Sequence, residues 1–156
     1  MTQKSDRRYR TALFPGSFNP FTRGHEDIVR RTLQICDRVI VAVGHNIEKS
    51  DSDIAPRVDA IRGALADLPG VSVISYSGLT GELAHHTGAD FIVRGVRSVT
   101  DFEYETNMAD ANRNMFGVET LLMPARPELA WISSSVVREL NAFGADTHEL
   151  LPSDKS

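Results

Sequence analysis

The chain has 156 residues, the size of one domain, and its composition of 41% hydrophobic and 24% charged residues is typical of a globular protein. The formal net charge of −4 argues against nucleic acid or an anionic membrane surface as a partner. No apolar run is long enough to span a membrane, and the single cysteine, Cys36, excludes an intrachain disulfide. We therefore expect one cytoplasmic domain over residues 1–156, with frayed termini at 1–9 and 153–156.

Short apolar runs alternate with amphipathic segments along the chain. The predicted strands are rich in Val, Ile, Leu and Phe and cover residues 11–14, 38–43, 71–75, 90–94 and 118–123. The predicted helices cover residues 25–36, 58–68, 81–87, 101–115 and 133–143. Asp101 is the candidate N-cap of the fourth helix, and residues 45–56 are predicted to form an exposed loop. This order predicts an α/β fold with a doubly wound, five-stranded parallel sheet and right-handed crossovers.

A polar or glycine-rich stretch follows each predicted strand, at the edge where open parallel sheets bind ligands. These stretches are PGSFNPFTRGH (15–25), GHNIEKS (44–50), SGLTG (77–81), RGVRSVTD (94–101) and PARPELAWISSS (124–135). The cations expected at this edge are Lys49, Arg94, Arg97, Arg126 and Arg138, and they are joined by His25. Backbone amides, helix N-termini and guanidinium groups all bind phosphate. The pattern therefore predicts a polyphosphate ligand.

Several motifs of other catalytic classes are missing from the sequence. It contains no G-x-x-x-x-G-K-[ST], and no G-x-G-x-x-G follows the first predicted strand, which argues against a P-loop site and a dinucleotide-binding site. It also contains no G-x-S-x-G, no paired cysteines and no H-x-x-x-H pattern. We therefore expect no nucleophile–base pair and no metal ligands from the protein itself.

Three motifs, in order along the chain, resemble those of one enzyme group. TRGH (22–25) and ISSSVVR (132–138) resemble the T/H-x-G-H and I-S-S-[ST]-x-x-[RK] signatures of nucleotidyltransferases. RGVRSVTDFEYE (94–105) is similar to the matching stretch of the bacterial phosphopantetheine adenylyltransferase family. The resemblance extends over residues 12–152 and implies a Rossmann-like nucleotidyltransferase fold. It also implies adenylyl transfer from ATP to 4′-phosphopantetheine in coenzyme A biosynthesis, with dephospho-coenzyme A and pyrophosphate as products.

The same resemblance implies roles for individual residues. His25 would stabilise the transition state. The implied ATP-binding residues are Ser17, Phe18, His25, Gly95, Val96, Arg97, Glu105, Leu129, Ala130, Trp131, Ile132, Ser133, Ser134 and Ser135. The implied acceptor-binding residues are Ser17, Lys49, Thr80 and Arg94. Arg138 would reach the β- or γ-phosphate. Mg²⁺ held mainly through the ATP phosphates and a homohexamer are further implications.

Some residues depart from the family pattern. Many relatives have Thr in place of Ser17, and a bulkier aromatic residue is typical where Leu129 stands, with Trp131 two places on. Thr80 occupies a position where Leu or Met is expected. The departures at Leu129 and Trp131 concern the adenine pocket, and the one at Thr80 concerns the pantetheine arm. The one at Ser17 is mild, because either hydroxyl can donate a hydrogen bond.

Two alternative functions remain open at this point. Another adenylyl- or cytidylyltransferase of the superfamily, such as a nicotinamide mononucleotide adenylyltransferase, would share TRGH and ISSSVVR. A non-catalytic nucleotide-binding domain of similar fold is the second alternative. Ser17, Lys49 and Arg94 favour phosphopantetheine as the acceptor. His25 favours an enzyme, because a nucleotide sensor has no need of an imidazole at the α-phosphate.

Overall fold

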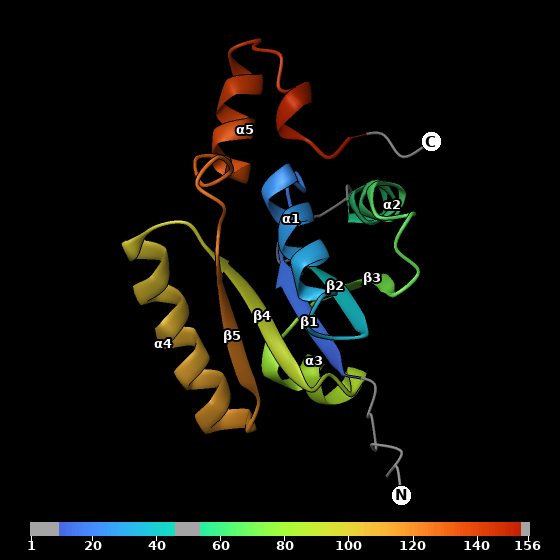
Figure 1. The fold of residues 1–156 in the computed structure, drawn as a ribbon, viewed down its shortest axis with the longest axis vertical. Helices are drawn as coiled ribbons and strands as arrows, with labels where there is room; N and C mark the ends of the chain where they lie inside the picture. Colours follow the sequence, from blue (N-terminus) through green and yellow to red (C-terminus); the bar gives the residue numbers. More distant parts are fainter. Residues whose placement is uncertain (1–9, 46–53, 154–156) are drawn as a thin grey trace, which may run out of the picture.

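The computed structural model describes residues 10–45 and 54–153. Within these ranges the chain forms a five-stranded sheet in the order β3-β2-β1-β4-β5, and every pairing is parallel (Figure 1). The strands are β1 (Thr11–Gly16), β2 (Arg38–Gly44), β3 (Val71–Tyr76), β4 (Phe91–Val96) and β5 (Glu119–Pro124). The predicted five-stranded parallel sheet is confirmed.

Helices cover both faces of the sheet. They are α1 (Arg23–Thr32), α2 (Ile54–Ala64), α3 (Thr80–Thr87), α4 (Val99–Phe116) and α5 (Ser134–Ala142), followed by the short 3-10 helix η1 (His148–Leu150). Apolar residues of α1 and α2 pack into one buried cluster against the sheet, and those of α3 pack into a second cluster with Phe116 at the end of α4. Figure 1 shows α5 beyond the carboxyl ends of the strands. The fold is therefore doubly wound, as predicted.

The central strand β1 shows why its sequence is apolar throughout. Ala12 and Phe14 belong to the cluster under α1 and α2, whereas Leu13 between them belongs to the cluster under α3. Successive side chains of a strand point to opposite faces, so a strand covered on both sides must be apolar at every position. All three residues are at most 3% exposed.

All five predicted helices are present, but each differs from its predicted boundaries by one to four residues at one or both ends. The N-cap of α4 is Ser98 and not Asp101: the Ser98 hydroxyl accepts a hydrogen bond from the Asp101 amide at 3.1 Å. Serine and aspartate are both good caps, and the chain uses the earlier one. The Asp101 carboxylate instead accepts from the Arg97 amide. Helix α2 begins at Ile54, inside the predicted loop 45–56.

The strand order places a topological switch point between β1 and β4. From β1 the sheet continues through β2 to β3 on one side and through β4 to β5 on the other. At such a point neighbouring loops diverge and leave a crevice at the carboxyl edge. The residues at this edge are Gly16 at the end of β1, Ser17 directly after it, and Arg94 and Gly95 near the end of β4. In the described ranges, no helix combines the length and the apolar character that a membrane crossing requires.

Candidate active site

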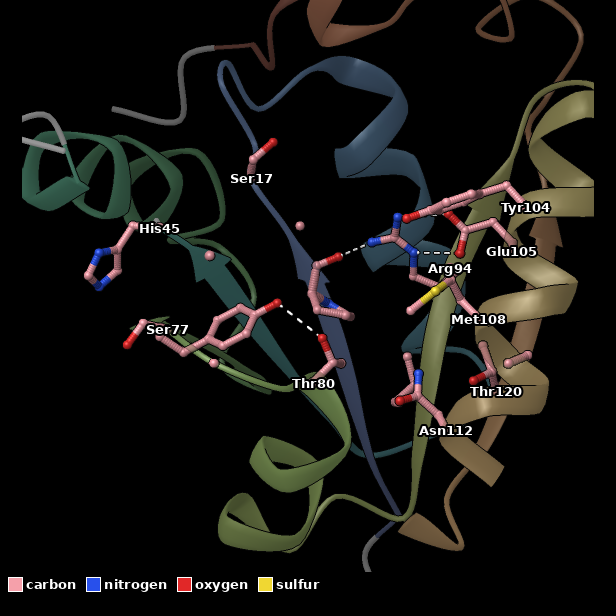
Figure 2. Close-up of a pocket in the computed structure, with 17 residues that line it drawn as sticks. Ser17, His45, Ser77, Thr80, Arg94, Tyr104, Glu105, Met108, Asn112 and Thr120 are labelled. Carbon is pink, nitrogen blue, oxygen red and sulfur yellow. Dashed lines mark hydrogen bonds and ion pairs between the residues drawn. The ribbon is translucent and has the colours of Figure 1, made fainter. Parts of the chain in front are cut away.

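Two adjoining cavities lie at the carboxyl edge of the sheet. The first, about 700 Å³ in volume, is lined by the ends of β2 and β3, by α3 and by α4, and we name it the α4 cavity (Figure 2). The second, about 360 Å³, is lined by the start of α1, the end of β4 and the start of α5, and we name it the α1 cavity. Gly16, Ser17, Arg94, Tyr104 and Glu105 line both. A single wall of residues therefore separates the two spaces.

Most residues predicted from the sequence lie around these cavities. Those of the predicted ATP set that line the α1 cavity are Ser17, Phe18, His25, Gly95, Arg97, Glu105, Leu129, Ile132, Ser133, Ser134 and Ser135. Ser17, Thr80 and Arg94 of the predicted acceptor set line the α4 cavity. Val96, Ala130 and Trp131 line neither cavity, and Trp131 is 56% exposed. Lys49 lies outside the described residues.

His25 sits in the first turn of α1, and the helix start fixes its ring. Thr22 is the N-cap, and its hydroxyl accepts from the His25 amide. In return, Nδ1 of His25 accepts from the Thr22 amide at 3.0 Å, which completes a capping box. A ring nitrogen that accepts a hydrogen bond carries no proton, so the neutral ring bears its proton on Nε2. His25 thus presents an N–H donor at the α1 cavity.

The surroundings of His25 keep the ring uncharged. It packs against Phe14, Phe18 and Phe21, with ring centroids 6.3, 5.0 and 5.4 Å away. Burial lowers the pKa of His25 to about 3, and the positive charges of Arg94 and Arg97 act in the same direction. At neutral pH the imidazole is therefore a neutral hydrogen-bond donor.

This low pKa predicts how stability depends on pH. The folded-state pKa of His25 lies below its ordinary value of 6.5, so the unfolded chain binds more protons between these values and stability falls as the pH falls through that window. Between about pH 7 and about pH 4.5, the His25→Gln variant should lose less free energy of unfolding than the wild type. Urea denaturation at both pH values measures this difference. His86→Gln, on the exposed side of α3, is the matched control and should follow the wild type. Equal losses in His25→Gln and the wild type would contradict the low pKa.

The turn that follows β1 is tightly packed. A Cβ atom on Gly16 would lie 2.9 Å from the buried Phe18 ring, so any larger residue there would have to displace that ring. Phe18 itself has a φ of 47°, a conformation that non-glycine residues rarely adopt and that often occurs at functional sites. The Asn19–Pro20 peptide bond is cis. This turn brings the Ser17 position to both cavities.

Helices α2 and α5 hold that turn from outside. Arg57 of α2 donates to the Ser17 carbonyl at 2.9 Å, and Arg138 of α5 donates to the Asn19 carbonyl at 2.6 Å. The Ser134 hydroxyl donates to the Pro20 carbonyl at 2.8 Å. Arg138, predicted to reach a phosphate, thus has at least one of its N–H groups engaged by the turn.

The three serines of the ISSS segment have different partners. Ser133 caps α5 and accepts from the Val136 amide at 3.1 Å, and Ser135 accepts from Arg138 at 3.2 Å. Both hydroxyls keep their own hydrogen for a further acceptor, whereas Ser134 donates its hydrogen to Pro20. All three residues line the α1 cavity. With the first-turn amides of α5, they form a helix N-terminus suited to an anion.

Arg94 is the cation of the shared wall, and hydrogen bonds hold its guanidinium on two sides. Its Nε and Nη2 donate to the two carboxylate oxygens of Glu105 at 2.9 and 2.8 Å, and Nη1 donates to the Pro15 carbonyl (Figure 2). The Glu105 side chain is only 8% exposed and that of Arg94 30%. The two residues were predicted to bind different substrates, and in the structure they form one ion pair.

The loop that follows β5 is fastened to α1 by charge pairs. Arg126 donates to Asp27 at 2.9 Å, and Arg31 donates to Asp27 at 3.2 Å and to the Pro124 carbonyl at 2.9 Å. Asp27 lies two residues after His25 on the same helix. These contacts fix the position of the loop that carries Leu129 relative to helix α1, on which His25 lies. Arg126, predicted among the phosphate-binding cations, is paired with Asp27.

Sequence reasoning missed several residues that line the α4 cavity. Tyr104, Met108 and Asn112 of α4 face it, as Figure 2 shows, and their four-residue spacing along a helix was the available signal. Thr120, a polar residue within the apolar strand β5, also lines it, and its buried hydroxyl has no hydrogen-bond partner within the described structure. The α4 cavity is thus lined by both polar and apolar side chains.

The described residues contain no group of three or more His, Cys, Asp or Glu side chains arranged to hold a metal ion. Of the acidic residues that line the α1 cavity, Glu105 is paired with Arg94 and Asp101 is paired with Arg97. Both of these carboxylates therefore already have a cationic partner.

The sequence matches one family model and several named bacterial enzymes. The model of the cytidylyltransferase-like family matches residues 13–140. The phosphopantetheine adenylyltransferase of Porphyromonas gingivalis is 51% identical over 142 residues, covering 90% of this chain and 93% of that protein. The enzymes of the same name from Bacteroides fragilis and Latilactobacillus sakei are 45% and 44% identical, each covering 92% of this chain and 96% and 88% of their own lengths.

Solved structures support the fold. A structure described as a nicotinate-nucleotide adenylyltransferase from Vibrio parahaemolyticus superposes with a TM-score of 0.64 at 18% identity, covering 94% of this chain and 95% of that one. The Rossmann-like sheet, the cavities at its switch point and the family match define a nucleotidyltransferase of the cytidylyltransferase-like class. Within that class, the extent of its identity with the bacterial enzymes shows that the chain belongs to the phosphopantetheine adenylyltransferase family.

Proposed function

We propose that this protein transfers the adenylyl group of ATP to 4′-phosphopantetheine, releasing pyrophosphate and dephospho-coenzyme A. The observation that carries this proposal is the wall shared by the two cavities, with Gly16, Ser17 and Arg94 open to both sides. An acceptor phosphate entering from the α4 cavity would meet a nucleotide α-phosphate in the α1 cavity at this wall. The high identity to enzymes that bear this name supports the choice of substrates.

The chemistry needs alignment and charge stabilisation. The attacking phosphate oxygen is already an anion, so no general base is required, and catalysis consists of positioning two phosphates and stabilising the charge that develops on the transferred one. The neutral His25 provides a donor from Nε2, and the N-termini of α1 and α5 add partial positive charge. Ser17 offers a hydroxyl at the wall.

The two substrates would divide the cavities between them. We assign the α1 cavity to ATP, with Ser133 and Ser135 toward the triphosphate and Leu129 toward the nucleoside. We assign the α4 cavity to the pantetheine arm, with Thr80 beside it and Arg94 at its phosphate. Thr80 already shares a hydrogen bond of 3.3 Å with Tyr76, which places its hydroxyl on the cavity side. Lys49 completes the proposed acceptor set.

The proposed cofactor is Mg²⁺, held mainly through the ATP phosphates. When bound there, it would neutralise part of the charge of the triphosphate. This proposal is supported by the donor set of the α1 cavity, whose described polar side chains suit anions, and whose acidic members Asp101 and Glu105 are paired with arginines.

We further propose a cytoplasmic homohexamer. Self-association is supported by α4, whose only buried residue is Glu105 and which exposes Val99, Phe102 and Met115, outside both cavities, at 52–77%. A helix with so much exposed apolar surface is typical of a surface that binds another protein. Light scattering in solution would give the number of copies of the 17.2 kDa chain.

The acceptor specificity is tested by turnover with purified protein. With ATP and Mg²⁺, pyrophosphate release and dephospho-coenzyme A, identified by its mass, are expected with 4′-phosphopantetheine. Nicotinamide mononucleotide, offered at the same concentration, should give at least about a hundredfold lower kcat/KM, because it lacks the extended arm that the α4 cavity accommodates. Turnover with the mononucleotide and none with 4′-phosphopantetheine would overturn the proposal in favour of the other adenylyltransferases. ATP binding without turnover on either acceptor would favour a non-catalytic domain.

A further inference from the structure

The loop that follows β5, residues 125–133, forms one side of the α1 cavity. Four of its residues line that cavity: Ala125, Leu129, Ile132 and Ser133. Within the loop, the Leu129 amide donates to the Arg126 carbonyl at 2.9 Å, and the Ile132 amide donates to the Leu129 carbonyl at 3.0 Å. These turns give the loop its local shape, whereas contacts that reach outside it set its position relative to α1.

Asp27 of α1 is the centre of one set of such contacts. Its Oδ1 accepts from Nε of Arg126 at 2.9 Å, and its Oδ2 accepts from Nη1 of Arg31 at 3.2 Å. Nη1 of Arg31 also donates to the Pro124 carbonyl at 2.9 Å, at the end of β5. The Asp27 side chain is only 17% exposed, so water screens its pairs less than it screens fully exposed ones. One carboxylate thus joins α1 to the first half of the loop.

The other end of the loop has a separate anchor. The Ser134 hydroxyl, in the first turn of α5, donates to the Pro20 carbonyl at 2.8 Å. This contact holds the start of α5, which we assign to the triphosphate. Asp27 and Arg126 themselves line neither cavity. Asp27 is therefore placed to act on the part of the loop around Leu129 from outside the cavity.

We propose that Asp27 is a positioning residue for the nucleoside of ATP, acting through Arg126 and Arg31. This inference rests on the proposed function, since it takes the α1 cavity to be the ATP site. The carboxylate holds the part of the loop around Leu129 at a fixed distance from α1, so this side of the nucleoside pocket is formed before the nucleotide binds. A preformed pocket costs less free energy of ordering on binding, which raises the affinity for the nucleotide.

The test compares two nucleotides that differ only in their number of phosphates, with Asp27→Asn as the variant. Asparagine keeps the shape, but it is uncharged and only its oxygen can accept from an arginine. The calorimetric Kd of ATP and that of AMP should rise by the same factor, about three- to tenfold. The kcat and the KM for 4′-phosphopantetheine should change by less than about twofold. An unchanged affinity for ATP, or a loss for ATP several times larger than that for AMP, would overturn the inference.

Asp67→Asn is the matched control. Asp67 also accepts from an arginine of α1, Arg30, with both of its carboxylate oxygens at 3.1 Å, and it lines neither cavity. Its variant should therefore keep the wild-type Kd for both nucleotides. A rise in this control equal to that in Asp27→Asn would assign the effect to a general loosening of α1 and would overturn the specific role of Asp27.

Arg126→Gln removes the same contact from the side of the loop. Because Arg126 is 51% exposed, this variant should fold even if Asp27→Asn does not, and it should weaken ATP and AMP by a similar factor. Adding Asp27→Asn to it should cost little further affinity, whereas independent effects that multiply would contradict a shared action. Thermal unfolding checks that each variant is folded.

Hydrogen exchange gives a readout that is independent of nucleotide binding. Without nucleotide, the amides of residues 125–132 should exchange faster in Asp27→Asn and Arg126→Gln than in the wild type, and at the wild-type rate in Asp67→Asn. Unchanged exchange in both of the first two variants would show that Asp27 does not hold the loop.

The wild-type protein distinguishes failure of this inference from failure of the proposed function. Wild-type turnover together with unchanged ATP affinity in the Asp27 and Arg126 variants contradicts the positioning role alone. A wild type that binds neither ATP nor AMP contradicts the proposed function and, with it, the inference.

Discussion

Replacing His25 with alanine is expected to lower kcat by about 10²–10³-fold while the KM for ATP changes by less than about threefold. The side chain donates from Nε2 at the α1 cavity, and the charge it would stabilise grows on the transferred phosphate during reaction. A neutral donor contributes little to binding the ground state and more to the transition state. The loss should therefore appear in kcat.

The measurement is steady-state pyrophosphate release at varied ATP and saturating acceptor. His86→Ala, on the exposed side of α3, is the control and should keep wild-type constants. Because His25 also closes the capping box of α1, the free energy of unfolding is measured in parallel, with a loss of about 1 kcal/mol expected. Equal losses in ATP affinity and turnover would contradict the proposed role and would favour a nucleotide-binding domain without catalysis.

Replacing Arg94 with glutamine is expected to have two separable effects. The acceptor KM should rise about a hundredfold, because the phosphate loses a two-point, charge-assisted contact. Stability should fall by about 2 kcal/mol, because Glu105 is left as a buried carboxylate without its cation; the partial exposure of Arg94 keeps this below the cost for a fully buried pair.

Adding Glu105→Gln to that variant separates the effects. The double variant should regain most of the stability, since no charge is left unpaired, but none of the acceptor affinity. Acceptor titrations and urea denaturation measure the two quantities. Arg113→Gln, an exposed arginine of α4 that pairs with Asp110, is the control. A double variant that regained acceptor affinity would show that Arg94 does not bind the acceptor phosphate.

The fold could be predicted from the sequence because its signals are local and repeated. Each strand is a short apolar run, and a strand covered on both faces must be apolar throughout, as Ala12, Leu13 and Phe14 are. The polar and glycine-rich stretches could be placed for the same reason, because each of them lies between an apolar strand and the amphipathic helix that follows it. The capping of α4 could not be settled in this way, because Ser98 and Asp101 are equally good caps and the backbone decides between them.

The candidate site was predicted residue by residue, but the pairings within it were not. Sequence order does not show that Glu105 of α4 closes on Arg94 of β4, or that Arg138 of α5 donates to the turn at Asn19. Such contacts depend on how separate elements pack. Residues without a motif, such as Thr120, were missed for the same reason: only the structure shows its buried hydroxyl at a cavity wall.

A crystal structure with dephospho-coenzyme A bound tests most directly the claim that transfer occurs across the wall between the two cavities. The adenosine half is expected in the α1 cavity near Leu129, the pantetheine arm in the α4 cavity near Thr80, and the diphosphate between them beside Ser17 and His25. A product that lay wholly within one cavity, or whose diphosphate lay away from His25, would contradict the account.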